Sequence, residues 1–183
     1  MNQQDDELIR CQWCSADQIY IDYHDHEWGR EVRGDNQLFE KISLEGFQAG
    51  LSWLTILKRR ENFRESFEGF EIEKVANYKH AKIERLMQDT GIIRNRKKIE
   101  SVIHNAQILR DSGTNLTELI WSYKPFADPH DHTRATSPES TELSRKLKSL
   151  GLSFVGPTTM YAMMQSIGMV NDHDPNCFLK TER

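Results

Sequence analysis

The sequence predicts an all-α fold. Apolar residues recur at spacings close to the helical repeat in three separate segments, residues 38–57, 83–87 and 99–109. No segment shows a convincing alternation of apolar and polar residues, which would mark a half-buried strand. The 183 residues, of which 37% are hydrophobic and 28% charged, suffice for a substantial core. We therefore expect one compact helical unit over residues 1–183.

The first apolar segment, residues 38–57, fits a pair of buried helices. The next two segments flank Thr90-Gly91, and the apolar residues of the second of them, 99–109, follow i, i+3, i+4 spacing. This order predicts a helix, a tight turn and a second helix over about residues 81–110.

Two further helices are expected toward the C-terminus. Leucines spaced along residues 143–150 predict a helix that stops at Gly151. Thr158-Thr159 is the expected N-terminal cap of another helix, which runs through Met164.

The stretch from Asp128 to Ser140 predicts an irregular connection, because prolines punctuate it and its surroundings. It contains His130 and His132, and a lone His-x-His in a polar loop favours solvated side chains over metal ligands. We therefore leave this stretch out of the candidate sites.

Charge and cysteine content limit the class of protein. The formal net charge of −4 argues against indiscriminate binding to polyanions, although local charge decides contacts with nucleic acid. No apolar run approaches the roughly 20 residues that cross a bilayer, and the acidic start of the chain is unlike a signal peptide. Three cysteines do not form a secreted disulfide framework. We expect a cytoplasmic protein with metal-bound or unpaired thiols and no membrane partner.

The turn at Gly91 carries a basic cluster. Glycine allows a tight turn, and Arg94, Lys97 and Lys98 lie where the following helix begins. A hairpin before a helix N-terminus presents backbone N–H groups and a positive dipole end to a phosphate. A helix-hairpin-helix holds a DNA backbone in this way without reading its sequence. From these residues alone, an ordinary turn between helices explains the segment equally well.

Residues suited to binding a metal ion stand in two pairs at opposite ends of the chain, Cys11 with His24 and His173 with Cys177. Thiolates and imidazoles in equal number suit tetrahedral zinc, and four protein ligands leave no open position for a catalytic water. Such an ion would tie the terminal segments together. Because Cys11-x-x-Cys14 together with His173-x-x-x-Cys177 is also a zinc pattern, the residues alone leave Cys14 and His24 as alternatives for the fourth ligand.

Aromatic residues gather around one acid in the first third of the chain. The constellation comprises Trp13, Tyr20, Tyr23, Trp28, Glu45 and Trp53. A flat, cationic ligand such as a purine would stack on Trp and Tyr faces while a buried carboxylate accepts hydrogen bonds from its N–H groups. Taken singly, each tryptophan fits a core position and Glu45 fits a helix surface, so only the combination predicts a site.

Over nearly its whole length, from Arg10 to Cys177, the chain resembles the bacterial 3-methyladenine DNA glycosylase I family. The motifs that carry the resemblance are Arg10-Cys11-x-Trp13, Tyr23-His24-Asp25-x-Glu27-Trp28-Gly29, Leu38-Phe39-Glu40, Leu44-Glu45-Gly46-x-Gln48-Ala49-Gly50-Leu51-Ser52-Trp53, Gly91-Ile92-Ile93-Arg94, Phe154-Val155-Gly156 and Val170-Asn171-Asp172-His173. The resemblance implies an all-helical, two-lobed helix-hairpin-helix fold, a structural zinc ion that joins the N- and C-terminal segments, and excision of 3-methyladenine from alkylated DNA.

The resemblance also implies one set of zinc ligands. Its members are Cys11, His24, His173 and Cys177. They place the zinc-binding segments at about residues 8–28 and 170–180, and they leave Cys14 as a spare thiol. Asp25 and Asp172 lie beside ligand histidines and are expected to support them by hydrogen bonds.

The implied base pocket consists of Glu45, Tyr23, Trp53 and Trp13. Glu45 would accept hydrogen bonds from the N6 amino edge of the flipped cationic base, the tryptophans would stack on the base, and the Tyr23 hydroxyl would hydrogen-bond to it. The residues expected to contact the backbone of double-stranded DNA are Gly91, Ile93, Arg94, Lys97 and Lys98.

The implied reaction is hydrolysis of the N-glycosidic bond, in which Glu45 binds and selects the base and aids departure electrostatically. No lysine nucleophile is expected, so neither is lyase activity, and no obligate protein partner is expected. Two other classes remain: a zinc-stabilised helical DNA-binding module without chemistry, and a zinc hydrolase with the metal at its centre. The first has no use for Glu45 in an aromatic cage, and the second needs an open metal position.

Overall fold

The structure, a computed structural model, describes residues 8–14, 16–126 and 134–180. Its helices are α1 (Gln18–His26), α2 (Asp35–Gln48), α3 (Trp53–Leu57), α4 (Arg60–Ser66), the 3-10 turn η2 (Glu68–Phe70), α5 (Ile72–Ala76), α6 (His80–Gln88), α7 (Arg96–Ser112), α8 (Leu116–Trp121), α9 (Pro138–Ser149) and α10 (Pro157–Ser166). The described residues contain no strand, which confirms the expected all-helical fold. None of their helices is long and apolar enough to cross a membrane.

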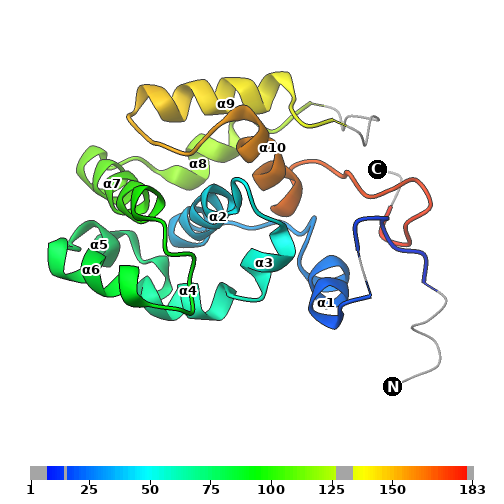
Figure 1. Cartoon of the computed structure of the whole chain (residues 1–183). Coiled ribbons are helices and arrows are strands. Elements are labelled where there is room, and N and C mark those ends of the chain that lie inside the picture. The colour runs from blue at the N-terminus through cyan, green and yellow to red at the C-terminus, as the bar shows by residue number, and fades with distance from the viewer. Residues whose placement is uncertain (1–7, 15, 127–133, 181–183) are drawn as a thin grey trace.

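Helix α2 lies in the middle of the molecule, with α7, α8 and α10 packed around it (Figure 1). Its sequence explains this position, because most of its length is buried: Leu38, Phe39, Ile42, Ser43, Leu44, Glu45, Gly46 and Phe47. A helix that is apolar on most sides must be enclosed by others. The acid Glu45 is therefore carried into the interior by its apolar neighbours.

The buried side chains form a large and a small hydrophobic cluster. The large cluster includes Phe47, whose ring centroid lies 4.6 Å from that of Phe63, so Phe47 is a core residue. The small cluster combines Cys11, Tyr23, Trp28, Leu57 and Cys177. Trp53 packs against both clusters. The base pocket expected around Trp53 thus lies where the two clusters meet.

Helix α9 begins earlier than the sequence predicted. Pro138 is its first residue, and Ser137 and Ser140 form a reciprocal capping box, so the expected irregular connection ends before Ser140. Proline suits the first helical position, because its missing N–H would have no partner there. The expected stop at Gly151 is confirmed by a φ of 101° there. The rest of the connection, with His130 and His132, lies outside the described residues.

Helix α10 also begins earlier than expected, at Pro157, with Gly156 as its N-cap and no side-chain cap. The predicted cap at Thr158-Thr159 is therefore wrong, because both threonines lie inside the first turn of a helix that Pro157 starts.

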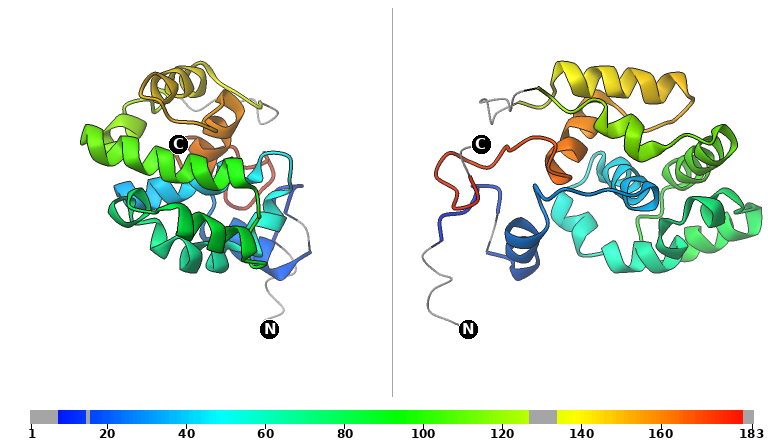
Figure 2. Two further views of the ribbon diagram at one scale, coloured as in Figure 1. Left: turned by 60° about the vertical axis from the view of Figure 1, so that its left-hand side comes forward. Right: turned by 180° about the vertical axis from the view of Figure 1, so that it is seen from behind.

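The two terminal segments lie side by side (Figure 2). The Phe178 amide donates to the Ile9 carbonyl at 2.8 Å, and the Gln12 amide donates to Asp174 Oδ2 at 2.6 Å. The N-terminal segment before α1 and the C-terminal segment after α10 are therefore joined, as we predicted from the paired Cys and His residues.

Candidate functional site

A pocket of about 210 Å³ opens between α1, α2, α3, α10 and the terminal segments. Its walls are formed by Trp13, Tyr20, Tyr23, Trp28, Glu45, Gln48, Trp53, Ala162, Gln165, Asp172 and Asp174. The four residues predicted to hold the base are all among them. The structure thus brings together side chains from elements that are far apart in the sequence.

Tyr23 and His24, consecutive residues of α1, face two different sites. Neighbouring side chains on a helix diverge by about 100°, so Tyr23 lines the pocket while His24 faces Cys11, His173 and Cys177. These four residues could hold a metal ion and are called the metal-ligand group below. Tyr23 is only 2% exposed and His24 is fully buried. Because both lie on one rigid turn, holding His24 also holds the pocket wall.

Helix α2 places Glu45 against the pocket with 5% of its surface exposed. Burial raises the pKa of Glu45 to about 8, and the Lys41 ammonium one turn earlier opposes this shift. Burial, followed by the charge of Glu45, also raises the pKa of the Tyr23 phenol well above its ordinary value. The empty pocket therefore favours the neutral forms of both groups, and a bound cation would favour ionised Glu45.

Aromatic rings surround this acid. The ring centroid of Trp53 lies 5.5 Å from that of Tyr23, and Trp53 is the first residue of α3, which Ser52 caps by accepting the Thr55 amide at 3.2 Å. The ring centroid of Trp13 lies 6.4 Å from that of Tyr23 and 5.0 Å from that of Trp28. These flat faces suit stacking with a planar ligand.

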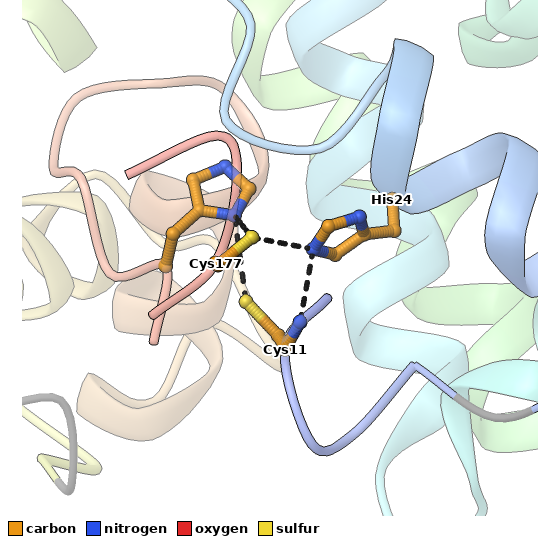
Figure 3. A group of neighbouring side chains, drawn as sticks. Cys11, His24 and Cys177 are labelled. Atoms are coloured by element: carbon orange, nitrogen blue, oxygen red, sulfur yellow. Dashed lines mark hydrogen bonds between the residues drawn. The ribbon is translucent and has the colours of Figure 1, made fainter. Parts of the chain in front are cut away.

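A second group of functional side chains joins the termini. The ligand atoms of Cys11, His24, His173 and Cys177 all lie within 4.8 Å of one another, and all four residues are buried. Figure 3 shows Cys11, His24 and Cys177 converging from α1 and the two terminal segments. Cys11 Sγ lies 3.4 Å from His173 Nδ1, and Cys177 Sγ lies 3.4 Å from His24 Nε2. A tetrahedral zinc site, with bonds of about 2.3 Å to sulfur and about 2.0 Å to nitrogen, puts such atoms about 3.5 Å apart. The donor set and its spacing fit the ion.

Hydrogen bonds orient one ligand of this group as expected. Asp25 Oδ1 lies 2.7 Å from His24 Nδ1, which leaves Nε2 directed at the sulfur atoms. Arg10 holds the same carboxylate, with Nη2 2.7 Å from Oδ2. The expected hydrogen bond between Asp25 and His24 is confirmed, and the Arg10 of the sequence motif has a structural reason.

The same expectation was wrong for Asp172. Its Oδ2 accepts hydrogen bonds from the Tyr161 hydroxyl at 2.7 Å and from Gln165 Nε2 at 2.8 Å, and its side chain lines the pocket. Adjacency to His173 in the sequence did not translate into a hydrogen bond, because the donors from α10 hold the Asp172 carboxylate.

Burial disfavours charge in the metal-ligand group. It raises the pKa of the Cys11 thiol to about 12 and lowers the pKa of His173 to about 4. A bound cation is therefore what would keep the cysteines as thiolates at neutral pH. Cys14 lies outside the group, with its Sγ 3.7 Å from the Tyr20 carbonyl oxygen, as the family resemblance predicted.

Helices α6 and α7 form the expected helix-turn-helix, with Arg94 and Lys97 exposed at the start of α7. Asp89 Oδ1 accepts the Gly91 amide at 2.8 Å. Gly91 lies in a turn, as expected, and does not adopt a positive φ. A Cβ there would lie 3.0 Å from the Asn62 side chain, so glycine allows a closer approach of Asn62 than a larger residue would.

The structure corrects the prediction for Lys98. This lysine is only 7% exposed, and its ammonium donates to the Phe47 carbonyl at 2.8 Å and to the Ala49 carbonyl at 2.6 Å. These carbonyls lie at the C-terminal end of α2, where a cation satisfies oxygens that the helix leaves without partners. Lys98 therefore ties α7 to α2 and is not presented to a DNA backbone.

Comparison with known proteins shows the family to which a chain with this site belongs. The model of the methyladenine glycosylase family matches residues 13–180. The chain belongs to this family. The DNA-3-methyladenine glycosylase of Haemophilus influenzae is 44% identical over 182 residues, which cover 94% of this chain and 98% of that protein. DNA-3-methyladenine glycosylase 1 of Escherichia coli is 45% identical over 181 residues, which cover 93% of this chain and 96% of that protein.

One of the similar solved structures contains a bound base. The crystal structure of a 3-methyladenine DNA glycosylase I variant in complex with 3-methyladenine superposes with a TM-score of 0.84 at 35% identity, covering 95% of this chain and 98% of that chain. The resemblance stated from the sequence motifs is confirmed.

The sequence placed Tyr20 in the aromatic constellation without giving it a role in the base pocket, and it did not assign Gln165 or Asp172 to the pocket. Tyr20 precedes Tyr23 by one helical turn, and that spacing on α1 was a usable signal. Gln165 of α10 and Asp172 come from elements whose path toward the pocket no sequence pattern shows. Asp172 was named only for its neighbour His173.

Proposed function

We propose that this chain hydrolyses the N-glycosidic bond of 3-methyladenine in alkylated double-stranded DNA, after flipping the base into the aromatic pocket. The observation that carries the proposal is the buried acid Glu45 on the wall of an aromatic pocket in a methyladenine glycosylase. The relatives named for this activity cover nearly the whole chain.

The pocket walls account for recognition of the base. Trp13 and Trp53 offer faces for stacking, and Tyr23 carries a hydroxyl within the wall. Glu45 accepts hydrogen bonds from the N6 amino edge of adenine, which distinguishes adenine from guanine with its carbonyl at that position. Flipping costs a few kcal/mol, and a lesion that pairs badly lowers this cost.

The charge of the substrate accounts for the chemistry. Adenine methylated at N3 is cationic within the nucleotide and leaves as a neutral molecule, so strong protonation by a general acid is not required. Glu45, ionised in the presence of the cation, favours the positively charged substrate and the oxocarbenium-like sugar electrostatically. Among the described residues, no lysine lines the pocket, which supports hydrolysis without a lyase step.

The hairpin provides the proposed contact with the DNA backbone. Arg94 and Lys97 are exposed where α7 begins, and Ile93 lies in the same turn, whereas the Gly91 amide already donates to Asp89 Oδ1. The positive end of the α7 dipole favours a phosphate at this place. Lys98 is left out of this set, because its ammonium is bound to carbonyl oxygens of α2 and of the residue after it.

We also propose that Cys11, His24, His173 and Cys177 hold one structural zinc ion. Four protein ligands close the coordination sphere, so the ion would supply stability and no reacting water. Since His24 neighbours Tyr23, the ion would also hold the pocket wall.

Chromatography of bases released from methylated DNA tests the proposed reaction, with unmethylated DNA as the control. We expect release of 3-methyladenine from the methylated substrate only. A DNA-binding module without chemistry would bind both DNAs and release no base, and that result would refute the proposal.

A further inference from the structure

A second carboxylate, Asp172, lines the base pocket from the segment after α10. Asp172 is 5% exposed, and its two carboxylate oxygens differ in their hydrogen bonding. Oδ2 accepts two hydrogen bonds, from Tyr161 and Gln165. Oδ1 is buried and has no hydrogen-bond partner among the described residues. Leaving a buried carboxylate oxygen unpaired is costly, so such an atom calls for a ligand that supplies the missing partner.

The distribution of such atoms supports this explanation. In the described part of the chain, four buried side-chain atoms lack a partner: Ser43 Oγ, Trp53 Nε1, Arg60 Nε and Asp172 Oδ1. Two of the four residues, Trp53 and Asp172, stand on the walls of the same pocket. One is a donor and the other an acceptor. A purine stacked on the Trp53 face cannot reach Nε1, which lies in the plane of the indole ring, but an N–H group at its edge can donate to Asp172 Oδ1.

The position of Asp172 is held before any ligand arrives. Tyr161 is 1% exposed, and Gln165 follows it one helical turn later on α10. Both donate to the same oxygen, so the carboxylate is tied to a rigid helix. An acceptor held in this way binds its ligand without losing side-chain freedom.

We propose that Asp172 is a base-binding residue, whose Oδ1 accepts a hydrogen bond from an N–H group of the flipped, positively charged base. The inference rests on the proposed function. Glu45 on α2 and Asp172 on the C-terminal segment then supply two carboxylates to one cation, and hydrogen bonds between an ionised acceptor and a cationic donor are the strong kind. Asp172 thereby adds to the preference for a charged, amino-bearing base.

Asp172→Asn tests this role. The Tyr161 and Gln165 donors orient the new amide, because only its oxygen can accept their hydrogen bonds, so its NH₂ group replaces Oδ1. An acceptor in the pocket becomes a donor while the network behind it is kept. We expect the affinity for free 3-methyladenine, measured by tryptophan fluorescence, to fall by about 10- to 100-fold, as loss of a hydrogen bond to a charged group does. kcat/KM for base release from methylated DNA should fall in parallel, with unfolding midpoint and metal content unchanged.

Ser43→Ala is the matched control. Ser43 Oγ is another buried oxygen without a partner among the described residues, but Ser43 does not line this pocket, so its removal should leave 3-methyladenine affinity unchanged. If Asp172→Asn does not fold, Tyr161→Phe removes one of the two donors that position Oδ2 and should weaken binding of the base in the same direction by a smaller factor.

Wild-type affinity for 3-methyladenine in folded Asp172→Asn would overturn the inference, as would wild-type affinity in Tyr161→Phe if only that variant folds. The unmodified chain, measured beside the variants, is expected to bind and release 3-methyladenine. If the unmodified chain releases none, the proposed function itself fails, and the two failures are thereby distinguished.

Discussion

The metal-ligand group and the base pocket share α1 as a wall, yet they treat buried polar atoms in opposite ways. In the metal-ligand group, the four ligand atoms face one another at close range and are enclosed. In the pocket, Asp172 Oδ1 and Trp53 Nε1 have no partner among the described residues, and burial raises the pKa of Glu45 to about 8. The first arrangement is complete once an ion is bound. The second leaves carboxylate oxygens for a ligand that carries N–H donors and positive charge.

Whether buried polar atoms have partners distinguishes structural residues from functional ones here, whereas residue type alone does not. Histidine, cysteine and aspartate are common in active sites, yet here the His and Cys residues form the closed group. Among the described residues, two of the four that carry a buried polar atom without a partner, Trp53 and Asp172, stand on the pocket wall beside the buried acid Glu45. The following predictions test this division, beginning with the largest expected effect.

Removing a metal ligand should unfold the molecule before it affects chemistry. Cys177→Ser is expected to lower the free energy of unfolding by several kcal/mol, because binding a structural zinc contributes about 10–16 kcal/mol in zinc-finger peptides. Denaturant unfolding with and without a chelator measures the effect. Cys14→Ser, outside the group, is the matched control and should behave like the unmodified chain. Equal stability of the two variants would contradict the closed metal site.

The pH dependence of stability should reflect the pocket. Burial raises the pKa of Glu45 from 4.5 to about 8, so the folded chain holds this proton more tightly than the unfolded chain. The stabilising contribution is full below pH 4.5 and is lost as pH rises through 8. At about 1.4 kcal/mol per pKa unit, the loss is about 5 kcal/mol. Glu45→Gln, which resembles the protonated acid, should lack this slope. Denaturant unfolding between pH 5 and pH 9 compares the two, and parallel curves would contradict the assignment.

The same substitution should separate chemistry from DNA binding. Glu45→Gln is expected to reduce release of 3-methyladenine by about 100-fold, the scale of losing one electrostatic contact to a transition state. Affinity for the DNA backbone should be unchanged, because Glu45 lies in the pocket and the hairpin lies elsewhere. Base chromatography and an electrophoretic mobility assay measure the two quantities. Unchanged release would show that the pocket is not the site of base recognition.

The smallest effect is expected at the hairpin, outside both regions. Arg94→Ala should reduce the slope of log affinity for DNA against log salt concentration by about 1, as loss of one phosphate contact does. Lys98→Met should leave that slope unchanged, since its ammonium binds the carbonyls of Phe47 and Ala49. Titrations at several salt concentrations test both, and an equal loss of slope in the two variants would restore Lys98 to the interface.

Much of the fold followed from local patterns. Helical periodicity located α2, α6 and α7, and Gly151 marked the end of α9. Errors arose where the signal was ambiguous, as at Thr158-Thr159, because a threonine caps a helix only if no better start precedes it. The motifs named the four residues of the metal-ligand group and four residues of the pocket. They did not separate Lys97 from Lys98, because these neighbours diverge by about 100° on α7 and only the packing against α2 decides which is buried.

The sequence by itself determined that the chain is helical, that paired Cys and His residues join its ends, and that aromatic residues gather around Glu45. Residue types and their spacings along the chain are sufficient to predict these properties. Only the tertiary structure decided that Lys98 faces inward, that Gly91 lies close to Asn62, and that Asp172, on the pocket wall, has one buried oxygen without a partner among the described residues. The physical reason is that burial and hydrogen bonding depend on groups that are distant in the sequence, and their arrangement exists only in the folded chain.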